Sequence, residues 1–267
     1  EYRRQRQMCI RDSDYADAVS VCNQLNIPLK KINYTKEYKD RVFSQFLDDH
    51  KNGFTPNPDV LCNKEIKFDV FQKYAKQIGA TKIASGHYAK IVKENDNFFI
   101  SKASDRTKDQ SYFLYQLKSS LLHNIEFPLG GLLKKDIRKI AEENNLVNAS
   151  KKDSTGICFI GDRKYNDFVC QFLKTKKGKI ITVDGEEIGH HDGHMYFTVG
   201  QRKGLGIGAR NSAFDKPWYV VNKDINKNIV YVAQGGTHPA LFSDQLLADN
   251  MYWSCLLYTS PSPRDMS

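Results

Sequence analysis

The order of two hydrophobic periods constrains the fold of this chain more than any other feature. From residue 14 to about residue 91, stretches with apolar residues at helical spacing alternate with short strand-like stretches. After about Gly178 the pattern changes to short strands separated by turns such as Asp184-Gly185. Alternating helices and strands are typical of an α/β domain with a mainly parallel sheet. The sequence therefore predicts an α/β domain followed by a smaller β-rich domain.

The expected elements of the first part can be placed by residue number. Helices are predicted at about residues 14–25, 36–52 and 68–78, and a strand at 29–34; a second strand starts at about residue 81 and runs into a turn at Gly86-His87. Residues 108–147 again have a helical pattern, clearest at 134–145. Ligands of parallel sheets bind beyond the carboxyl ends of strands, which is where Ser85-Gly86-His87 would lie.

The two ends of the chain do not fit their neighbours. The first stretch, EYRRQRQMCIRDS, and the last, SCLLYTSPSPRDMS, lack an amphipathic period and end in similar text. Both resemble translated sequencing-adapter sequence. We therefore expect the native segment to run from about Asp14 to about Trp253.

Composition excludes some classes of protein and leaves the partner open. The sequence contains no run of about 18 apolar residues, so no membrane span is predicted. The basic N-terminus lacks the apolar stretch of a secretory signal. The six cysteines of the 267 residues form no CxxC pair or His/Cys cluster. A chain of this size does not need disulfides, so a cytoplasmic location is expected. The net charge of +9 fits either simple solubility or a polyanionic partner.

Two cysteines stand where a thiol could be reactive. Cys62, in NPDVLCNKEIKF, lies between a proline-stiffened loop and a predicted helix, where free N–H groups and nearby lysines would stabilise a thiolate. Cys158, in KKDSTGICFIG, follows small polar residues and a glycine. Each could instead be a buried packing residue, the commoner state of an unpaired cysteine.

Three polar motifs also have two interpretations. His87 could donate a hydrogen bond at a ligand site or be a structural histidine. The run Lys108-Asp109-Gln110 could be no more than polarity at a helix N-terminus. GQRKGLGIG lacks the strand and helix that flank a dinucleotide fingerprint, and is better interpreted as a flexible basic loop suited to phosphate contacts.

Taken together and in order, five motifs closely resemble one family, the tRNA-specific 2-thiouridylases (tRNA-uridine 2-sulfurtransferases). They are TPNPDVLCNKEIKF, ASGHYA, KDQSYFLY, KKDSTGICFIG, and GQRKGLGIG followed by PWYVV. The resemblance implies an adenine-nucleotide-hydrolase-like (PP-loop) domain with a parallel sheet, then a small β-rich domain. The resulting division is a non-native tail (1–13), the truncated α/β domain (14–175), the β-rich domain (176–240), the start of a C-terminal β-barrel (241–253) and a second non-native tail (254–267).

The resemblance also implies a reaction. ATP, with Mg²⁺, adenylates the C2 oxygen of the wobble uridine, and Gly86 lies against the ATP. Cys158 carries a persulfide, received from a donor or relay protein fed by a cysteine desulfurase, and its sulfur attacks C2. Cys62 is the nucleophile-side cysteine that helps release the sulfur, leaving a transient Cys62–Cys158 disulfide that a reductant reopens.

The implied partner is tRNA, with the acceptors for Lys, Glu and Gln as substrates. The flipped target base would leave a loop that is already partly unstacked. No metal ligands and no membrane are implied. The residues assigned to the target base or to other tRNA contacts are Asn57, Pro58, Asp59, His87, Lys108, Asp109 and Gln110.

The sequence departs from the family pattern in two places. The family opens with a strand and a pyrophosphate loop of the type SGGxDSS, which this sequence does not contain, and the C-terminal barrel is present only at its start. We therefore expect the polypeptide as written to be inactive in thiolation and its longer parent to be active.

Three other functions fit parts of the sequence. A synthetase of the same superfamily that adenylates a small molecule would not need the two separated cysteines or the basic β-rich domain. A non-catalytic RNA-binding module would use the cysteines structurally. A thiol-redox protein is disfavoured because a CxxC motif is missing.

Overall fold

The computed structural model describes residues 12–152, 168–173, 175–207, 216–249 and 251–252. The chain divides into two compact units. Of the described residues, the first contains 12–43, 58–152 and 251–252, and the second contains 44–57, 168–173, 175–207 and 216–249. Residues 44–57 thus pack with the second unit, although they lie inside the segment that we predict as the α/β domain.

The helices of the first unit, and α4 of the second, follow the predicted order. Helix α2 spans Asp12–Gln24, and α8 spans Lys134–Glu143. A helical run starts with α3 (Thr35–Tyr38) and the π-helix η1 (Lys39–Phe43), and continues into α4 (Ser44–Lys51). Gln24 donates a hydrogen bond to the carbonyl oxygen of Asn144 over 2.7 Å, which ties α2 to the end of α8.

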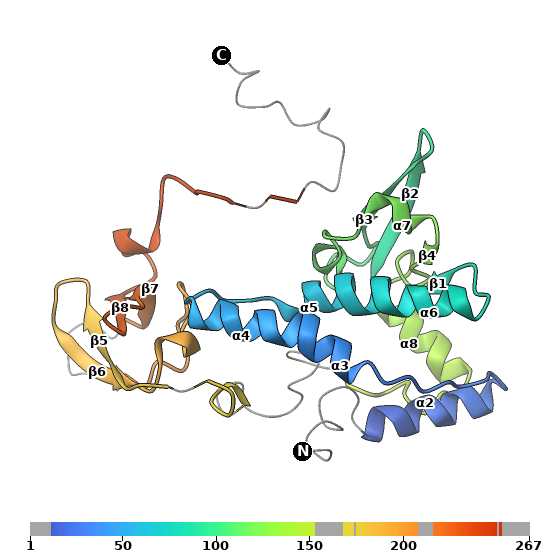
Figure 1. Ribbon diagram of the computed structural model, residues 1–267, viewed down its shortest axis with the longest axis horizontal. Coiled ribbons are helices and arrows are strands. Elements are labelled where there is room, and N and C mark those ends of the chain that lie inside the picture. The colour runs from blue at the N-terminus through green and yellow to red at the C-terminus, as the bar shows by residue number, and fades with distance from the viewer. Residues whose placement is uncertain (1–11, 153–167, 174, 208–215, 250, 253–267) are drawn as a thin grey trace. The chain divides into compact units, whose positions relative to one another are not determined.

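The third predicted helix begins earlier than expected. It consists of α5 (Pro58–Leu61), the π-helix η2 (Cys62–Val70) and α6 (Phe71–Gln77), which form one continuous ribbon in Figure 1. The prediction of a start at residue 68 was wrong because prolines were taken as loop residues. Proline is favoured in the first turn, where its missing N–H would have no partner. The helix ends before Gly79, whose φ of +86° suits a glycine.

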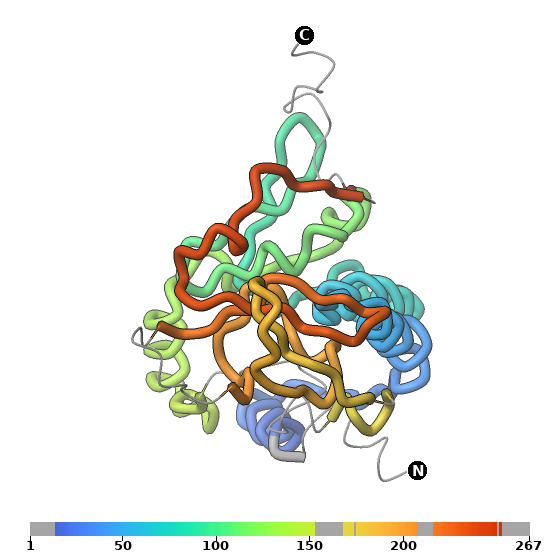
Figure 2. Tube along the Cα trace, turned by 90° about the vertical axis from the view of Figure 1, so that its left-hand side faces the viewer, coloured from blue at the N-terminus to red at the C-terminus, as the bar shows by residue number. Residues whose placement is uncertain are grey.

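The strands of the first unit form two small sheets. Strand β1 (Ile83–Ala84) pairs in parallel with β4 (Ile125–Glu126). Strands β2 (Ala89–Glu94) and β3 (Asn97–Lys102) form an antiparallel hairpin, whose turn projects outward from this unit in both views (Figures 1 and 2). The hairpin turns at Asn95 and Asp96, both with positive φ.

Two sequence predictions fail in this region. The predicted strand at residues 29–34 is not a strand, and these residues pair with no strand among those described. An alternating pattern becomes a strand only when a neighbour supplies the hydrogen bonds. Residues 108–147 are less helical than predicted, since they contain only η3 (Ser111–Phe113), α7 (Ser119–Leu122) and α8 besides β4.

The core of the first unit lies around the parallel pair. Its buried members come from the long helix, the start of β2 and the segment that follows η3: Phe68, Ala89, Leu114, Leu117, Leu122, Ile125 and Phe127. Gly130 lies directly on this core, because a Cβ atom there would be 1.7 Å from the carbonyl oxygen of Ala89.

The second unit is built on a four-stranded sheet. Its strands are β5 (Gly178–Thr182), β6 (Glu187–His191), β7 (Trp218–Asp224) and β8 (Ile229–Gln234), in the order β6-β5-β8-β7. The predicted β5–β6 hairpin is confirmed, with Gly185 at φ +90° in its turn. Short 3₁₀ helices η4 (His194–Tyr196) and η5 (Pro239–Leu241) accompany the sheet. The predicted class, an α/β region followed by a β-rich one, is therefore present. Among the described helices, none has both the length and the apolar character that a membrane span requires.

Candidate functional site at the end of the parallel strands

The carboxyl ends of β1 and β4 lead to the candidate site. Strand β1 runs into Ser85-Gly86-His87, and β4 runs into Phe127. The His87 ring lies 5.9 Å from the ring of Phe68 and 5.9 Å from that of Phe127, measured between centroids. Its Nδ1 is 2.7 Å from the hydroxyl of Ser85. The fold thus fixes the orientation of His87 from both sides.

The surroundings of His87 keep its imidazole neutral. The side chain is 9% exposed. Burial, and then the charge of Lys67, lower the pKa of His87 to about 4. At neutral pH the ring is therefore uncharged, with one nitrogen that can donate a hydrogen bond and one that can accept.

The predicted tRNA segment Lys108-Asp109-Gln110 is fixed beside this turn. The main-chain N–H of Tyr88 donates to Oε1 of Gln110 over 3.0 Å, and the N–H of Gln110 donates to the carbonyl oxygen of Tyr88 over 2.8 Å. Asp109 accepts from the N–H of Ala103 and from the hydroxyl of Ser111, both over 2.7 Å. These side chains of Asp109 and Gln110 hold the segment next to His87.

Cys62 lies on the long helix that faces the same segment. Cys62 is partly buried and is the first residue of the π-helix η2. Short π-helical stretches are frequent at functional sites. The neighbouring Asn63 is 2% exposed and donates to the carbonyl oxygen of Phe113 over 3.1 Å. Because Phe113 belongs to the short helix that starts after Gln110, Asn63 connects the Cys62 helix to the segment beside His87.

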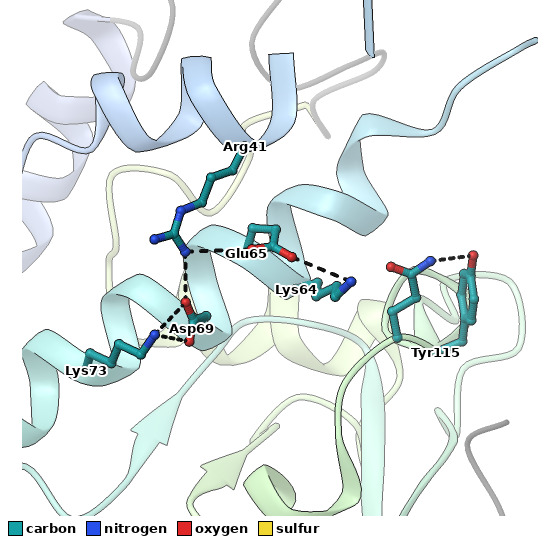
Figure 3. A network of polar contacts seen from close by, with 7 residues as sticks. Arg41, Lys64, Glu65, Asp69, Lys73 and Tyr115 are labelled. Atoms are coloured by element: carbon teal, nitrogen blue, oxygen red, sulfur yellow. Dashed lines mark hydrogen bonds and ion pairs between the residues drawn. The ribbon is translucent and has the colours of Figure 1, made fainter. Parts of the chain in front are cut away.

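Charges on the Cys62 helix are largely paired. Figure 3 shows Arg41 reaching from η1 to Glu65 and Asp69, with N–O distances of 3.7 and 3.0 Å. Lys73 also pairs with Asp69, at 2.7 Å. Lys64, which the sequence suggests as a cation for Cys62, lies 3.5 Å from Glu65. Its charge is thus shared with a carboxylate.

The remaining predicted residues fall in different places. Pro58 is buried as the first residue of α5, and Asp59 follows it in the same turn. Asn57, directly before them, is exposed and is the last residue of the second unit's early segment. Cys158 lies outside the described residues, as do the two terminal segments that we predict to be non-native, except for Asp12 and Ser13. The Cys62–Cys158 pairing remains a prediction.

Gly86 lies in the turn that follows β1. A Cβ atom at this position would be 3.9 Å from Cδ1 of Leu129, an ordinary contact. Packing in the described structure therefore does not require glycine at this position. Among the described residues, no three His, Cys, Asp or Glu side chains come together as a metal site.

Sequence reasoning missed the residues that support the site. Ser85 orients His87, Phe68 and Phe127 enclose it, and Asn63 links the Cys62 helix to it. Asn63 also has a buried Oδ1 with no hydrogen-bond partner in the described part of the chain. The signal in the sequence that could have pointed to Asn63 was its position next to Cys62. An amide that is buried beside a candidate nucleophile needs a hydrogen-bond partner.

Comparison with known proteins identifies the family. A family model described as the tRNA methyl transferase HUP domain matches residues 1–162, and one described as the tRNA methyl transferase PRC-barrel domain matches residues 166–234. The tRNA-specific 2-thiouridylase MnmA 1 of Geobacillus kaustophilus is 53% identical over 244 residues, which cover 91% of this chain and 65% of that protein. The MnmA enzymes of Hahella chejuensis and Legionella pneumophila (strain Lens) are 51% and 50% identical over 92% of this chain and over 67% and 68% of their own lengths. The chain belongs to the tRNA-specific 2-thiouridylase family.

Membership of the thiouridylase family confirms the resemblance drawn from the five motifs. The two family models follow one another in the predicted order, an α/β domain and then a β-rich one. The first model includes residues 1–13, a segment that we predict to be non-native. The chain spans about two thirds of the length of the thiouridylases that it matches.

Proposed function

We propose that this protein is an ATP-dependent tRNA-uridine 2-sulfurtransferase that thiolates the wobble uridine. The observation that carries the proposal is the neutral, enclosed His87 at the carboxyl edge of the parallel strands. It is tied through the Gln110 segment and Asn63 to the helix that bears Cys62. The name of the relatives, tRNA-specific 2-thiouridylase, supplies the reaction that such a site would serve.

The proposed reaction has three steps. The C2 oxygen of the uridine attacks the α-phosphate of ATP, pyrophosphate leaves, and the base carries AMP. The terminal sulfur of a Cys158 persulfide then attacks C2, and AMP leaves with the former C2 oxygen. Finally the Cys62 thiolate attacks the Cys158 sulfur, which releases 2-thiouridine and forms a Cys62–Cys158 disulfide that an external dithiol reduces.

The described residues have roles that do not require a metal site in the protein. Gly86 would let ATP approach the main chain, and Mg²⁺ would arrive with the ATP phosphates, as is usual for this ion. Neutral His87 would donate to, or accept from, the tRNA near the target base. Asn57, Pro58 and Asp59 would contact that base, and Lys108 would contact the tRNA beside the segment that Asp109 and Gln110 hold.

The proposed partners follow from the same reaction. They are tRNA, with the Lys, Glu and Gln acceptors as the expected substrates, and a persulfide donor or relay protein fed by a cysteine desulfurase. We place the protein in the cytoplasm together with these proposed partners.

A reconstitution assay tests the proposal. The chain is joined at both ends to the segments of the Geobacillus kaustophilus relative that lie outside the match, then mixed with ATP, Mg²⁺, a persulfide donor and tRNA. We expect 2-thiouridine by mass spectrometry, and its loss in Cys62→Ser and in Cys158→Ser. Cys22→Ser is the matched control, because Cys22 is a partly buried thiol on α2 and has no proposed role. A folded protein that binds tRNA but forms no 2-thiouridine would support a non-catalytic RNA-binding module instead.

A further inference from the structure

Lys223 joins two main-chain segments of the second unit. It lies near the end of β7 and donates hydrogen bonds to the carbonyl oxygens of Gly53, over 2.6 Å, and Phe197, over 2.8 Å. Gly53 follows helix α4, whereas Phe197 follows η4. One ammonium group thus holds together segments that are more than a hundred residues apart in the sequence.

Two more contacts hold the same loop. The hydroxyl of Thr55 lies 3.0 Å from that of Thr198. Gly53 has a φ of +75°, and a Cβ atom there would be 2.4 Å from Cδ1 of Ile225. Residues 53–55 are therefore fixed by hydrogen bonds at both ends and by close packing at Gly53.

The partly buried ammonium group of Lys223 depends on its two hydrogen bonds to carbonyl oxygens. Burial lowers the pKa of Lys223. Nearby, His50 is 2% exposed and stacks edge-on against Phe46 at 4.6 Å. Burial, and then the charge of Lys223, lower the pKa of His50 to about 4, so this neighbour is neutral. The two carbonyl dipoles therefore contribute much of the stabilisation of the ammonium, and charge-assisted hydrogen bonds are stronger than neutral ones.

The loop held by Lys223 leads directly to the proposed target-base residues. Asn57 comes two residues after Thr55 and is followed by Pro58 and Asp59. The loop also presents Phe54, whose side chain is 65% exposed. Unpaired bases of RNA loops are recognised by stacking on aromatic rings and by hydrogen bonds to their edges. An exposed ring and an amide on a fixed loop supply both kinds of contact.

We propose that Lys223 is a positioning residue for recognition of the target uridine, because it holds Gly53 at the start of the loop of residues 53–57, which carries Phe54 and Asn57. This role rests on the proposed function. A lysine that merely stabilised the sheet would change the free energy of unfolding without changing which base the protein prefers. A positioning lysine changes the preference between bases, since hydrogen bonds to a base edge depend on where the loop lies.

The decisive measurement is the preference for uridine over cytidine in RNA binding, compared between the unsubstituted chain and its variants. Dissociation constants are measured by fluorescence anisotropy, at one salt concentration, for two anticodon stem-loop RNAs that differ only in having uridine or cytidine at the wobble position. Hydrogen exchange of residues 53–57 is recorded in parallel. In Lys223→Met we expect faster exchange in this loop and a fall of about fivefold in the uridine-to-cytidine affinity ratio, equivalent to about 1 kcal/mol.

Matched variants separate positioning from loss of charge or stability. Lys227→Met removes a lysine from the turn after β7, where it is exposed and pairs with Asp224 at 3.7 Å, and should leave the ratio unchanged. Lys223→Arg keeps the charge and the donors, and should restore part of the ratio. Thr198→Val removes the second contact of the loop with little change in volume, and should also lower the uridine-to-cytidine affinity ratio. It serves as the test variant if Lys223→Met does not fold.

Each remaining outcome has a defined meaning. Faster exchange with an unchanged ratio, in Lys223→Met or in Thr198→Val, would show that the loop is held but does not position the base contacts, and would overturn the proposal. Unchanged exchange in the folded Lys223→Met variant would also overturn it. Failure of the unsubstituted chain to prefer uridine would contradict the proposed RNA recognition itself, and is distinguishable because it needs no substitution.

Discussion

At the scale of single residues, each of the two units buries a histidine. His87 and His50 are both almost fully buried, one in each unit, and burial lowers the pKa of both to about 4. A histidine that stays neutral in the native state takes up a proton on unfolding once the pH falls below its ordinary value. Each of these histidines therefore makes stability depend on pH.

The pH dependence of stability tests the environment of His87. Its contribution is fully present above the unfolded pKa of 6.5, and it is lost as the pH falls toward the folded value of about 4. Between about pH 7 and pH 5 the loss should be roughly 1–2 kcal/mol. Urea unfolding at both pH values measures the decrease in the free energy of unfolding between pH 7 and pH 5. In His87→Gln this decrease should be smaller by roughly 1–2 kcal/mol, while the contribution of His50 to it remains. An identical pH dependence in both proteins would contradict a buried neutral His87.

At the scale of elements, the long helix and the small parallel pair could be predicted only in part. Helical periodicity correctly placed α2, the run from α3 to α4, and α8. It missed the first turns of the Cys62 helix, because the pattern of prolines and polar residues in TPNPDV is also that of a loop. The predicted strand at 29–34 failed because alternation says which face is apolar but not whether a partner strand is there.

The candidate site, like the fold, could be predicted only in part from the sequence. The motifs located His87, Cys62 and the Gln110 segment, since these residues lie in recognisable text. The supporting contacts of Ser85, Asn63 and Phe127 depend on which segments meet in space. Those contacts could not be predicted because nothing in the local pattern says which distant segment will be the neighbour.

Two adjacent glycines test how closely the elements of the first unit pack. A Cβ atom at Gly130 would lie 1.7 Å from the carbonyl oxygen of Ala89, whereas one at Gly131 would have nothing within 4 Å. Gly130→Ala should therefore lower the free energy of unfolding by at least about 2 kcal/mol, the usual scale of overpacking. Gly131→Ala should change it by less than about 0.5 kcal/mol. Chemical denaturation measures both, and equal effects of the two substitutions would contradict the packing described for β2.

At the scale of the whole molecule, the second unit takes one helix from far upstream. Residues 44–57 carry the buried Phe46 and His50 and accept the hydrogen bond of Lys223 at Gly53. The family model for this region begins only at residue 166, so sequence similarity alone does not include the early segment in the domain. Its role is visible from the packing.

Supplying the early segment separately should restore the second unit. We expect a fragment of residues 163–249 to unfold with poor cooperativity, and to gain a cooperative transition when a peptide of residues 44–57 is added. Amide chemical shifts of Lys223 and Ile225 should move on binding, because these residues contact Gly53. A peptide with Gly53→Ala is the control, since its Cβ atom would be 2.4 Å from Cδ1 of Ile225. A fragment that unfolds identically with and without the peptide would contradict the division into units.

The discontinuous second unit has a consequence for biosynthesis. Residues 44–57 leave the ribosome before residues 58–162 and must wait for their partners in residues 163–249. At synthesis rates of about 5–20 residues per second, that wait is on the order of ten seconds. During this time the apolar face of α4 is exposed on a nascent chain, while the residues of the first unit around it can already fold. The helix that precedes residues 53–57 is thus synthesised early and packed late, so translation speed and chaperone access in this interval should influence the yield of correctly folded protein.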